Sequence, residues 1–327
     1  MQHKNKVTTQ LDNKSEYIKF CQNNNDIPLF HQAFWWEIMT SGKWNVAISK
    51  DKNNNIKAVL PYHIKKKAGF KFVLQPQLTP YGGILYFYPP DLKKQISIYS
   101  FQNKHAENII KQIPENTLFQ HMKFSPLIEN WYPFFKNNYE QTTRYTYLLR
   151  DIKNHDRIFT GFSNTLKRQI REASEKFDIT EEENVCLVFS LMKNSLKRQN
   201  INFNPDKTQI KKLDTKLTKN NQRKIFFARD KSGKPVSGLY LVWDSNSAYL
   251  LGLGSDYNTN IDNSTKLLIW ESIKYASKHV DIYDFEGSMI EGVERLYKNF
   301  GGKKIPYFEI KKYKNRFIKA AFSLLKR

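Results

Sequence analysis

The sequence predicts an α/β (α+β) fold with two tandem domains, each a mixed, mostly antiparallel sheet flanked by helices. Its 327 residues are more than one hydrophobic core usually needs and suffice for two. Both halves mix short strand-like segments with longer segments of helical spacing. A strand–turn–strand pattern recurs, since AISKDKNNNIKAVLPYHI and FFARDKSGKPVSGLYLV align Asp51-Lys52 with Asp230-Lys231. We therefore expect duplicated domains at 1–150 and 151–327, although polar hairpin turns also recur by chance.

In the first half, apolar spacing predicts helices near 16–22 and over 92–113, and an apolar segment over 30–39. Alternating apolar residues predict six strands, at 44–49, 56–64, 70–74, 83–88, 118–124 and 143–149. A polar turn at 51–55 separates the first two strands.

In the second half, Leu166, Ile170, Ala173 and Phe177 form the apolar stripe of a helix over 164–177. Helices are also expected at 186–199, in the basic segment 207–224 and at 264–278, with a short helix after Ser288. The strand patterns lie at 224–229, 236–243, 248–255, 282–285 and 307–313.

Composition excludes several classes of protein. The chain is 40% hydrophobic and 14% aromatic, which is too apolar for a disordered chain. No apolar run is long enough to cross a membrane, and the first residues do not resemble a secretory signal. Cys21 and Cys186 are the only cysteines, so neither a disulfide framework nor a zinc cluster is expected. We therefore expect a cytoplasmic protein without a metal.

The net charge of +22 is spread over both halves. Residues 193–224 and 298–327 are the most basic segments, with 10 basic residues each. Such a field favours nucleic acid, phosphorylated substrates or an anionic membrane surface. The alternative is a lysine-rich composition that charges every surface, because lysines outnumber arginines. The C-terminal KNRFIKAAFSLLKR is a basic amphipathic helix that either contacts the inner face of a membrane or packs on the last domain.

The most informative segment is DIYDFEGSMIEGVERLYKNFGGKK, residues 281–304. It predicts a strand, a glycine-containing turn, an amphipathic helix and a glycine stop. Asp284 and Glu286 are two residues apart, so both lie on one face at the carboxyl end of the strand, where open α/β sheets bind ligands. Either carboxylate is a candidate catalytic base for an attacking amine. The alternatives are a cap of the turn or a buried pair with lysine.

This order of elements resembles the FemABX-like branch of the GNAT acyltransferase superfamily, the tandem-GNAT peptidoglycan aminoacyltransferases and their relatives. The resemblance covers nearly the whole chain. In the second half it rests on FSNTLKRQIREASEKFDI (162–179), SLKRQNINF (195–203), KLLIWESIKYASKHVDIYDFEGSM (266–289) and GVERLYKNFGG (292–302). In the first half, uncharacterised bacterial members have segments similar to FHQAFWWEIM (30–39), LPYHIKKKAGF (60–70) and PQLTPYGG (76–83).

The resemblance implies transfer of an acyl or aminoacyl group to an amine, with a cell-envelope precursor or another phosphate-bearing molecule as acceptor. It implies that Lys298, in the family's Phe/Tyr-Lys-x-x-Phe-Gly motif, lies near the oxyanion formed during transfer. The alternative is an i,i+4 pair with Glu294 on the helix surface. The first domain is then expected to shape the acceptor site without catalysing the reaction.

Other residues are candidates for binding the substrate. Arg295 lies one turn from Lys298 and either binds a phosphate or pairs with Glu291. Three basic residues of the 164–177 helix either hold phosphates or are solvated, and these are Lys167, Arg168 and Arg171. Tyr81, in the glycine-containing loop 76–83, either contacts a ligand or belongs to an ordinary turn.

No permanently bound cofactor is expected, and the donor candidates are aminoacyl-tRNA, acyl carrier protein and acyl-CoA. GNAT enzymes that use acetyl-CoA carry a glycine-rich loop whose amides hold the pyrophosphate. The corresponding segment 256–264 has no glycine and contains two aspartates, so we expect acetyl-CoA to bind poorly. The substrate is expected to be anionic, such as tRNA or a nucleotide-linked precursor. The competing hypothesis is a non-catalytic basic protein that binds RNA, anionic lipid or phosphate ligands.

Overall fold

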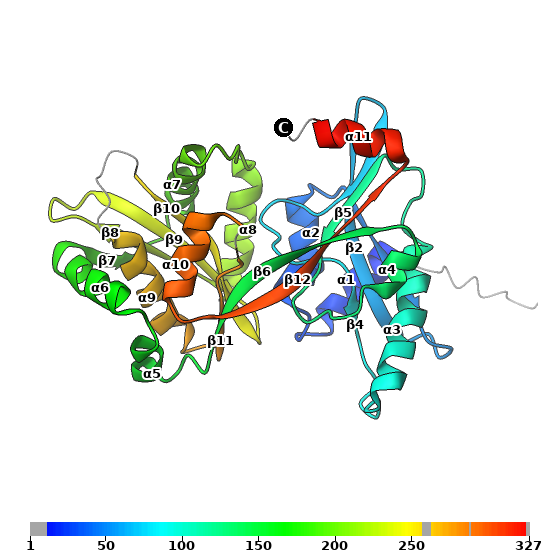
Figure 1. Cartoon of the computed structure of the whole chain (residues 1–327), viewed down its shortest axis with the longest axis horizontal. Helices are drawn as coiled ribbons and strands as arrows, with labels where there is room; N and C mark the ends of the chain where they lie inside the picture. Colours follow the sequence, from blue (N-terminus) through cyan, green and yellow to red (C-terminus); the bar gives the residue numbers. More distant parts are fainter. Residues whose placement is uncertain (1–11, 257–262, 288, 325–327) are drawn as a thin grey trace, which may run out of the picture.

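A computed structural model describes residues 12–256, 263–287 and 289–324. Figure 1 shows two lobes joined by two long strands, β6 and β12, that cross from one lobe to the other. One twelve-stranded sheet runs through both lobes, in the order β1-β2-β3-β5-β12-β6-β11-β10-β9-β8-β7, with β4 paired to β2. The described part of the chain therefore has the expected mixed sheet flanked by helices.

The first lobe contains α1 (Asn13–Gln22), the 3₁₀ helix η1 (Leu29–His31), α2 (Ala33–Met39), β1 (Trp44–Lys50), β2 (Ile56–Lys67), β3 (Phe70–Leu74), β4 (Leu85–Tyr86), α3 (Gln95–Ile110), β5 (Phe119–Lys123), α4 (Tyr132–Lys136) and β6 (Glu140–Arg150). The expected helices and strands are present. The strand expected at 83–88 is reduced to the two residues of β4, and α4 was not expected because its single turn is too short to show a helical period.

The second lobe contains α5 (His155–Thr160), α6 (Asn164–Lys176), β7 (Asp178–Glu181), α7 (Val185–Arg198), α8 (Lys207–Lys219), β8 (Arg223–Arg229), β9 (Pro235–Trp243), β10 (Ser247–Ser255), α9 (Ser264–Ala276), β11 (Ile282–Asp284), α10 (Glu291–Asn299), β12 (Lys303–Tyr313) and α11 (Arg316–Leu324). The expected helices and strands of this half are confirmed. The short α5 and the edge strand β7 were not expected, and β12 begins four residues before the expected strand.

The two lobes share one strand order, as the duplication hypothesis requires. β1-β2-β3 and β8-β9-β10 are antiparallel hairpins, and each is followed by a helix and then by a strand parallel to its third member. The hairpin turns also match. Asp51 accepts hydrogen bonds at 2.9 Å from the backbone N–H groups two and four residues further on, and Asp230 does the same at 2.9 and 3.0 Å.

The long strands β6 and β12 each pair with strands of the other lobe. β12 is the last strand in sequence, but it pairs antiparallel with β5 of the first lobe as well as with β6. β6 in turn pairs with β11 of the second lobe. A domain boundary at residue 150 falls at the end of β6, and the chain crosses back to the first lobe afterwards.

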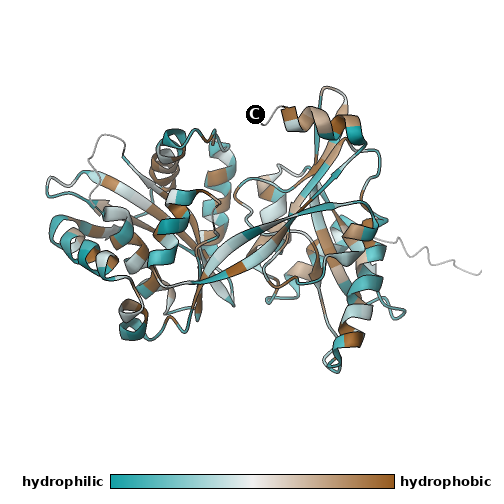
Figure 2. Ribbon diagram, in the orientation of Figure 1, coloured by the Kyte–Doolittle hydropathy of each residue, from teal (hydrophilic) through white to brown (hydrophobic). Residues whose placement is uncertain are grey.

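The lobes also share buried side chains. One core cluster combines residues of α1, α2 and β1 with residues of α7, α8 and β8–β10. Phe30 packs edge-on against Tyr249, with ring centroids 4.8 Å apart, and the backbone N–H of Leu29 donates to Asp244 at 3.0 Å. In Figure 2, hydrophilic residues cover the outer face of α6, and the crossing strands β6 and β12 are mostly teal to white. Among the described residues, no helix combines the length and apolarity needed to cross a bilayer.

Candidate active site

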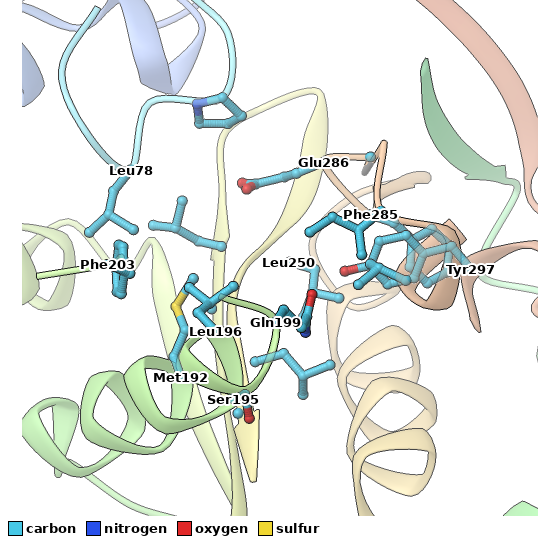
Figure 3. Close-up of a pocket in the computed structure, with 18 of the residues that line it drawn as sticks. Leu78, Met192, Ser195, Leu196, Gln199, Phe203, Leu250, Phe285, Glu286 and Tyr297 are labelled. Carbon is cyan, nitrogen blue, oxygen red and sulfur yellow. The ribbon is translucent and has the colours of Figure 1, made fainter. Parts of the chain in front are cut away.

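A pocket opens where β10 and β11 separate. The two strands pair in parallel only from Ser247 opposite Ile282 to Tyr249 opposite Asp284. Beyond that point a pocket of about 620 Å³ lies between 250–255 of β10 and 285–287 after β11 (Figure 3). Helices α7 and α10 line its sides, and loop 76–80 of the first lobe also lines it. The pocket therefore lies at the carboxyl end of β11, where the sequence placed the site, and both lobes form it.

The shape of β10 explains the separation. Its register with β9 shifts between Leu250 and Gly252, which marks a β-bulge inside the strand. A bulge bends its strand and increases the local twist. Further along, a Cβ added at Gly254 would lie 2.1 Å from the backbone N of Met192, so α7 packs directly on the strand. The bend and the close approach to α7 carry β10 away from β11.

Glu286 is the carboxylate of the pocket. Its half-buried side chain points into the space between β10 and loop 76–80 (Figure 3). Its Oε1 atom is buried and has no hydrogen-bond partner within the described residues. Burial and the charge of Asp284 raise the pKa of Glu286 well above its ordinary value, and the nearby Lys123 only partly opposes this. Such a group can accept a proton from a substrate.

The backbone after β11 sets this orientation. Glu286 and Gly287 both have positive φ angles, of 59° and 63°. A Cβ added at Gly287 would lie 2.0 Å from the carbonyl oxygen of Tyr145 on β6, so only glycine fits. The sharp turn against β6 directs Glu286 into the pocket.

Asp284 lies behind Glu286 and does not line the pocket. It is buried, and it accepts hydrogen bonds from Thr146 Oγ1 at 2.5 Å and from the backbone N–H of Glu286 at 2.7 Å. Burial raises the pKa of Asp284 to about 6, although these hydrogen bonds oppose the shift. The structure therefore gives Asp284 contacts that hold the strand end, whereas Glu286 faces the cavity.

Two cations of the first lobe also line the pocket, and the sequence did not identify them. They are Lys123 at the end of β5 and Arg144 on β6. Arg144 pairs with Glu309 at 3.1 Å, while its Nε atom is buried without a partner in the described chain. Burial lowers the pKa of Lys123. Both residues lie in strands that the sequence predicts. The sequence of a single strand does not show which residues of the other lobe it will lie beside, so neither residue was predicted to line the pocket.

Lys298 and Arg295 lie on α10 but outside the pocket. The helix turns its apolar side to the cavity, through Ile290, Val293, Leu296 and Tyr297. Lys298 is exposed, and Arg295 is exposed and pairs with Glu291 at 2.7 Å. This pair is the alternative that the sequence left open for Arg295.

The three basic residues of α6 are also outside the pocket lining. Arg168 pairs with Glu172 at 2.9 Å, Arg171 stands 5.8 Å from the centre of the Phe159 ring, and Lys167 is half-buried on the same helix. Both arginines therefore have partners on the surface of the second lobe.

Tyr81 is buried beside the pocket. Its ring centroid is 5.4 Å from that of Tyr307, which lines the cavity. Burial, followed by the charge of Asp284, raises the pKa of Tyr81 well above its ordinary value. Its hydroxyl is buried beside Asp284 and Thr146.

Most of the segment 256–264 lies outside the described residues, since the structure describes only Asp256, Asn263 and Ser264 of it. Asp256 pairs with Lys234 at 3.1 Å, and Ser264 begins α9. Within the described parts of the chain, no group of three or more His, Cys, Asp or Glu side chains is placed to hold a metal ion.

No family model matches the sequence, and no curated protein matches it. Solved structures match most of the chain. FemX aligns with a TM-score of 0.65 and 12% identity, over 97% of this chain and 99% of FemX. L-PGS from Bacillus licheniformis aligns with a TM-score of 0.56 and 9% identity, over 97% of both chains. A tandem GNAT protein from the clavulanic acid biosynthesis pathway aligns with a TM-score of 0.50 and 7% identity, over 83% of both. These likenesses confirm the tandem GNAT-like fold.

Proposed function

We propose that the protein transfers an activated acyl or aminoacyl group to an amine bound in the pocket between the lobes. The observation that carries this proposal is the carboxylate of Glu286, which points into the cavity with a buried, unpartnered oxygen. An acceptor amine is protonated at neutral pH and must lose a proton before it can attack. A carboxylate with a raised pKa is better matched to this task than an ordinary one.

In the proposed reaction, Glu286 takes a proton from the acceptor ammonium. The freed lone pair attacks the acyl carbon, a C–N bond forms, and the carbonyl becomes an oxyanion. The attacking nitrogen then gives up a second proton to solvent. Collapse of the intermediate breaks the bond to the leaving oxygen or sulfur, which takes the proton held by Glu286. The bulge of β10 borders the pocket, and a bulge leaves its extra residue outside the ladder, so a backbone N–H there can donate to the oxyanion.

We assign the binding of an anionic part of the substrate to Lys123 and Arg144. Both line the pocket, and burial strengthens their interaction with an anion. Lys298 is exposed on the opposite side of α10, so we give it no direct role at the reacting atoms. The fold shared with FemX and L-PGS, together with the FemABX-like sequence resemblance, favours an aminoacyl donor and a cell-envelope acceptor.

The test is Glu286→Gln, which preserves size and removes the base. Donors of the three classes, acyl-CoA, acyl carrier protein and aminoacyl-tRNA, would be supplied with amine acceptors. With the active donor, turnover should fall by about 10²–10³ while the melting temperature is kept. Wild-type turnover should also fall as the pH drops through the raised pKa of Glu286, because the base must be ionised.

The matched control is Glu291→Gln on α10, where the carboxylate is exposed and pairs with Arg295. It should leave turnover unchanged. If Glu286→Gln retains full turnover and the acid limb of the pH profile, Glu286 is not the base and the proposal fails.

A further inference from the structure

Helix α11 has an apolar face that the described chain leaves uncovered. Ile318 and Phe322 face inward, and Phe322 packs on Phe119 and Tyr313 with ring centroids 4.9 and 5.9 Å apart. A second apolar stripe at i, i+3, i+4 and i+7 is exposed and consists of Phe317, Ala320, Ala321 and Leu324. Phe317 is 85% exposed and Leu324 is 72% exposed. A helix in water normally turns such a stripe inward.

The tip of the β2–β3 hairpin carries the same combination of charge and apolar surface. Its sequence, KKKAGFK at 65–71, is exposed throughout and contains four lysines and no acid. Phe70 at the tip is 54% exposed. Ala68 and Gly69 have φ angles of 48° and 76°, as a tight two-residue hairpin turn requires. The turn presents Phe70 among lysines.

The hairpin tip and α11 lie at the same end of the molecule (Figure 1). Phe70 and Lys71 line one small pocket with Lys314, which precedes α11. A chain of hydrogen bonds connects them, from the N–H of Leu118 to the carbonyl of Lys71 and from the N–H of Lys314 to the carbonyl of Leu118, both within 3.1 Å. We call this end of the molecule the hairpin–helix surface, comprising Lys65, Lys66, Lys67, Phe70, Lys71, Lys314, Arg316, Phe317 and Leu324.

We propose that the hairpin–helix surface binds an anionic phospholipid bilayer. Exposed apolar side chains ringed by lysines match the two parts of a lipid surface, an apolar interior and negative headgroups. A second copy of this chain would bring the same positive charges together. RNA would match the charge and its bases could stack on Phe70 and Phe317, but it would leave the aliphatic side chain of Leu324 uncovered, whereas a bilayer interior covers both kinds of side chain. This inference does not depend on the transferase chemistry.

The experiment measures partition of the full chain into vesicles of phosphatidylcholine, with and without phosphatidylglycerol. The protein should bind the anionic vesicles preferentially, and added salt should weaken binding. Phe317→Ser with Leu324→Ser should reduce the partition coefficient about tenfold or more, because both side chains leave the interface. Changing Lys65, Lys66 and Lys67 to Gln should weaken binding and flatten its dependence on salt. All five side chains are exposed, so both variants should fold.

Two matched controls use exposed residues elsewhere. Leu127→Ser removes another exposed apolar side chain of the first lobe, and Lys207, Lys211 and Lys212 to Gln removes three lysines from α8. Neither should alter partition. Equal binding to neutral vesicles, equal losses in variants and controls, or a dimer that depends on Phe317 without vesicle binding would each overturn the proposal.

Discussion

The two lobes repeat one strand order but differ at their parallel strand pair, which is β3 and β5 in the first lobe and β10 and β11 in the second. In the second lobe, β10 and β11 separate after Tyr249 and leave the pocket. In the first lobe, β3 and β5 pair at only two positions, but the following segment fills the gap between them. Gly82 pairs with Phe124, and its N–H donates to the carbonyl of Lys123 at 2.8 Å. Gln75 accepts from the N–H of Lys123, also at 2.8 Å.

The bulge is a second difference. β9 and β10 shift register between Leu250 and Gly252, whereas β2 and β3 pair without a shift from His63 to Lys67. The second lobe thus has both an opening and a distorted strand beside it. The first lobe has a closed gap, and the loop that closes it becomes a wall of the second lobe's pocket. Two lobes with one strand order can therefore form a single pocket, with one lobe holding the cavity and the other enclosing it.

The largest expected effect is a loss of stability when glycine is replaced by alanine. The two positions compared are Gly287 beside the open pocket of the second lobe and Gly83 beside the closed gap of the first lobe. Both have positive φ angles. A Cβ at Gly287 meets the backbone of β6, while one at Gly83 meets the Phe124 ring at 2.3 Å. The hydrogen-bonded backbone of β6 can move less than the Phe124 side chain to make room for a methyl group. Gly287→Ala should therefore lower the unfolding free energy by about 4 kcal/mol and Gly83→Ala by less. Denaturant titration measures both, and a larger loss for Gly83→Ala would contradict the expectation.

The next effect contrasts two buried carboxylates, Asp284 on β11 and Glu309 on β12. Asp284 has a pKa raised to about 6, so its folded form holds a proton more tightly than its unfolded form. Its contribution to stability is therefore present at low pH and is lost as the pH rises from about 4 to about 6, by roughly 3 kcal/mol. Asp284→Asn should flatten this part of the curve of unfolding free energy against pH. An unchanged slope would show that Asp284 has an ordinary pKa.

Glu309 should behave with the opposite sign. Burial alone would raise its pKa, but the hydrogen bond from His121 at 2.6 Å and the charges of His121, Lys311 and Arg144 outweigh burial and hold the pKa well below its ordinary value. Its contribution to stability is present above the ordinary carboxyl pKa and is lost as the pH falls below it. Glu309→Gln should reduce stability at neutral pH and weaken this acid dependence. The same denaturant titrations, repeated across pH, separate the two carboxylates.

A smaller effect tests whether the first lobe acts on the pocket through charge. Lys123→Met keeps the apolar stem and removes a cation that lowers the pKa of Glu286. The acid limb of turnover should therefore move to higher pH, with about a tenfold loss of turnover on that limb. Lys104→Met, an exposed lysine of the same lobe, is the control and should leave the limb in place. If the two variants give the same profile, the first lobe does not influence the base through Lys123.

The smallest effect concerns the matching hairpin turns. Asp51→Ala and Asp230→Ala each remove a carboxylate that accepts two hydrogen bonds from backbone N–H groups of its turn. Each should lower the melting temperature slightly and by a similar amount, because the two turns have the same geometry. Clearly unequal shifts, measured by thermal unfolding, would show that the two turns are not equivalent in energy.

The sequence identifies most elements because helical and strand periods come from local spacing. It also places Glu286 at a strand end, since a strand followed by a glycine turn is a local pattern. Lys123 and Arg144 escape this reasoning, because their place depends on the pairing of β6 and β12, which are more than 150 residues apart in sequence. Pairing between strands of different lobes cannot be predicted from the spacing of residues within either strand.

The position of Lys298 shows what residue spacing on a helix cannot predict. An apolar stripe on a short helix normally packs against a core, which would leave the opposite face open to a site. Here the stripe of Ile290, Val293 and Leu296 lines the pocket itself, so Lys298 on the other side is exposed. Residue spacing fixes which side chains share a face of the helix. Tertiary contacts, such as the hydrogen bond that Tyr147 on β6 donates to Glu294, decide what that face meets.

The return of β12 to the first lobe has a consequence for synthesis of the protein. A nascent chain that has emerged only as far as β6 contains every strand of the first lobe's sheet except β12, so β5 has no partner on one side. Domains usually fold one by one as the ribosome releases them, but this lobe must wait for residues 303–313. Until they are made, β5 offers an unpaired edge to other chains, so that edge is where we expect chaperones to be needed.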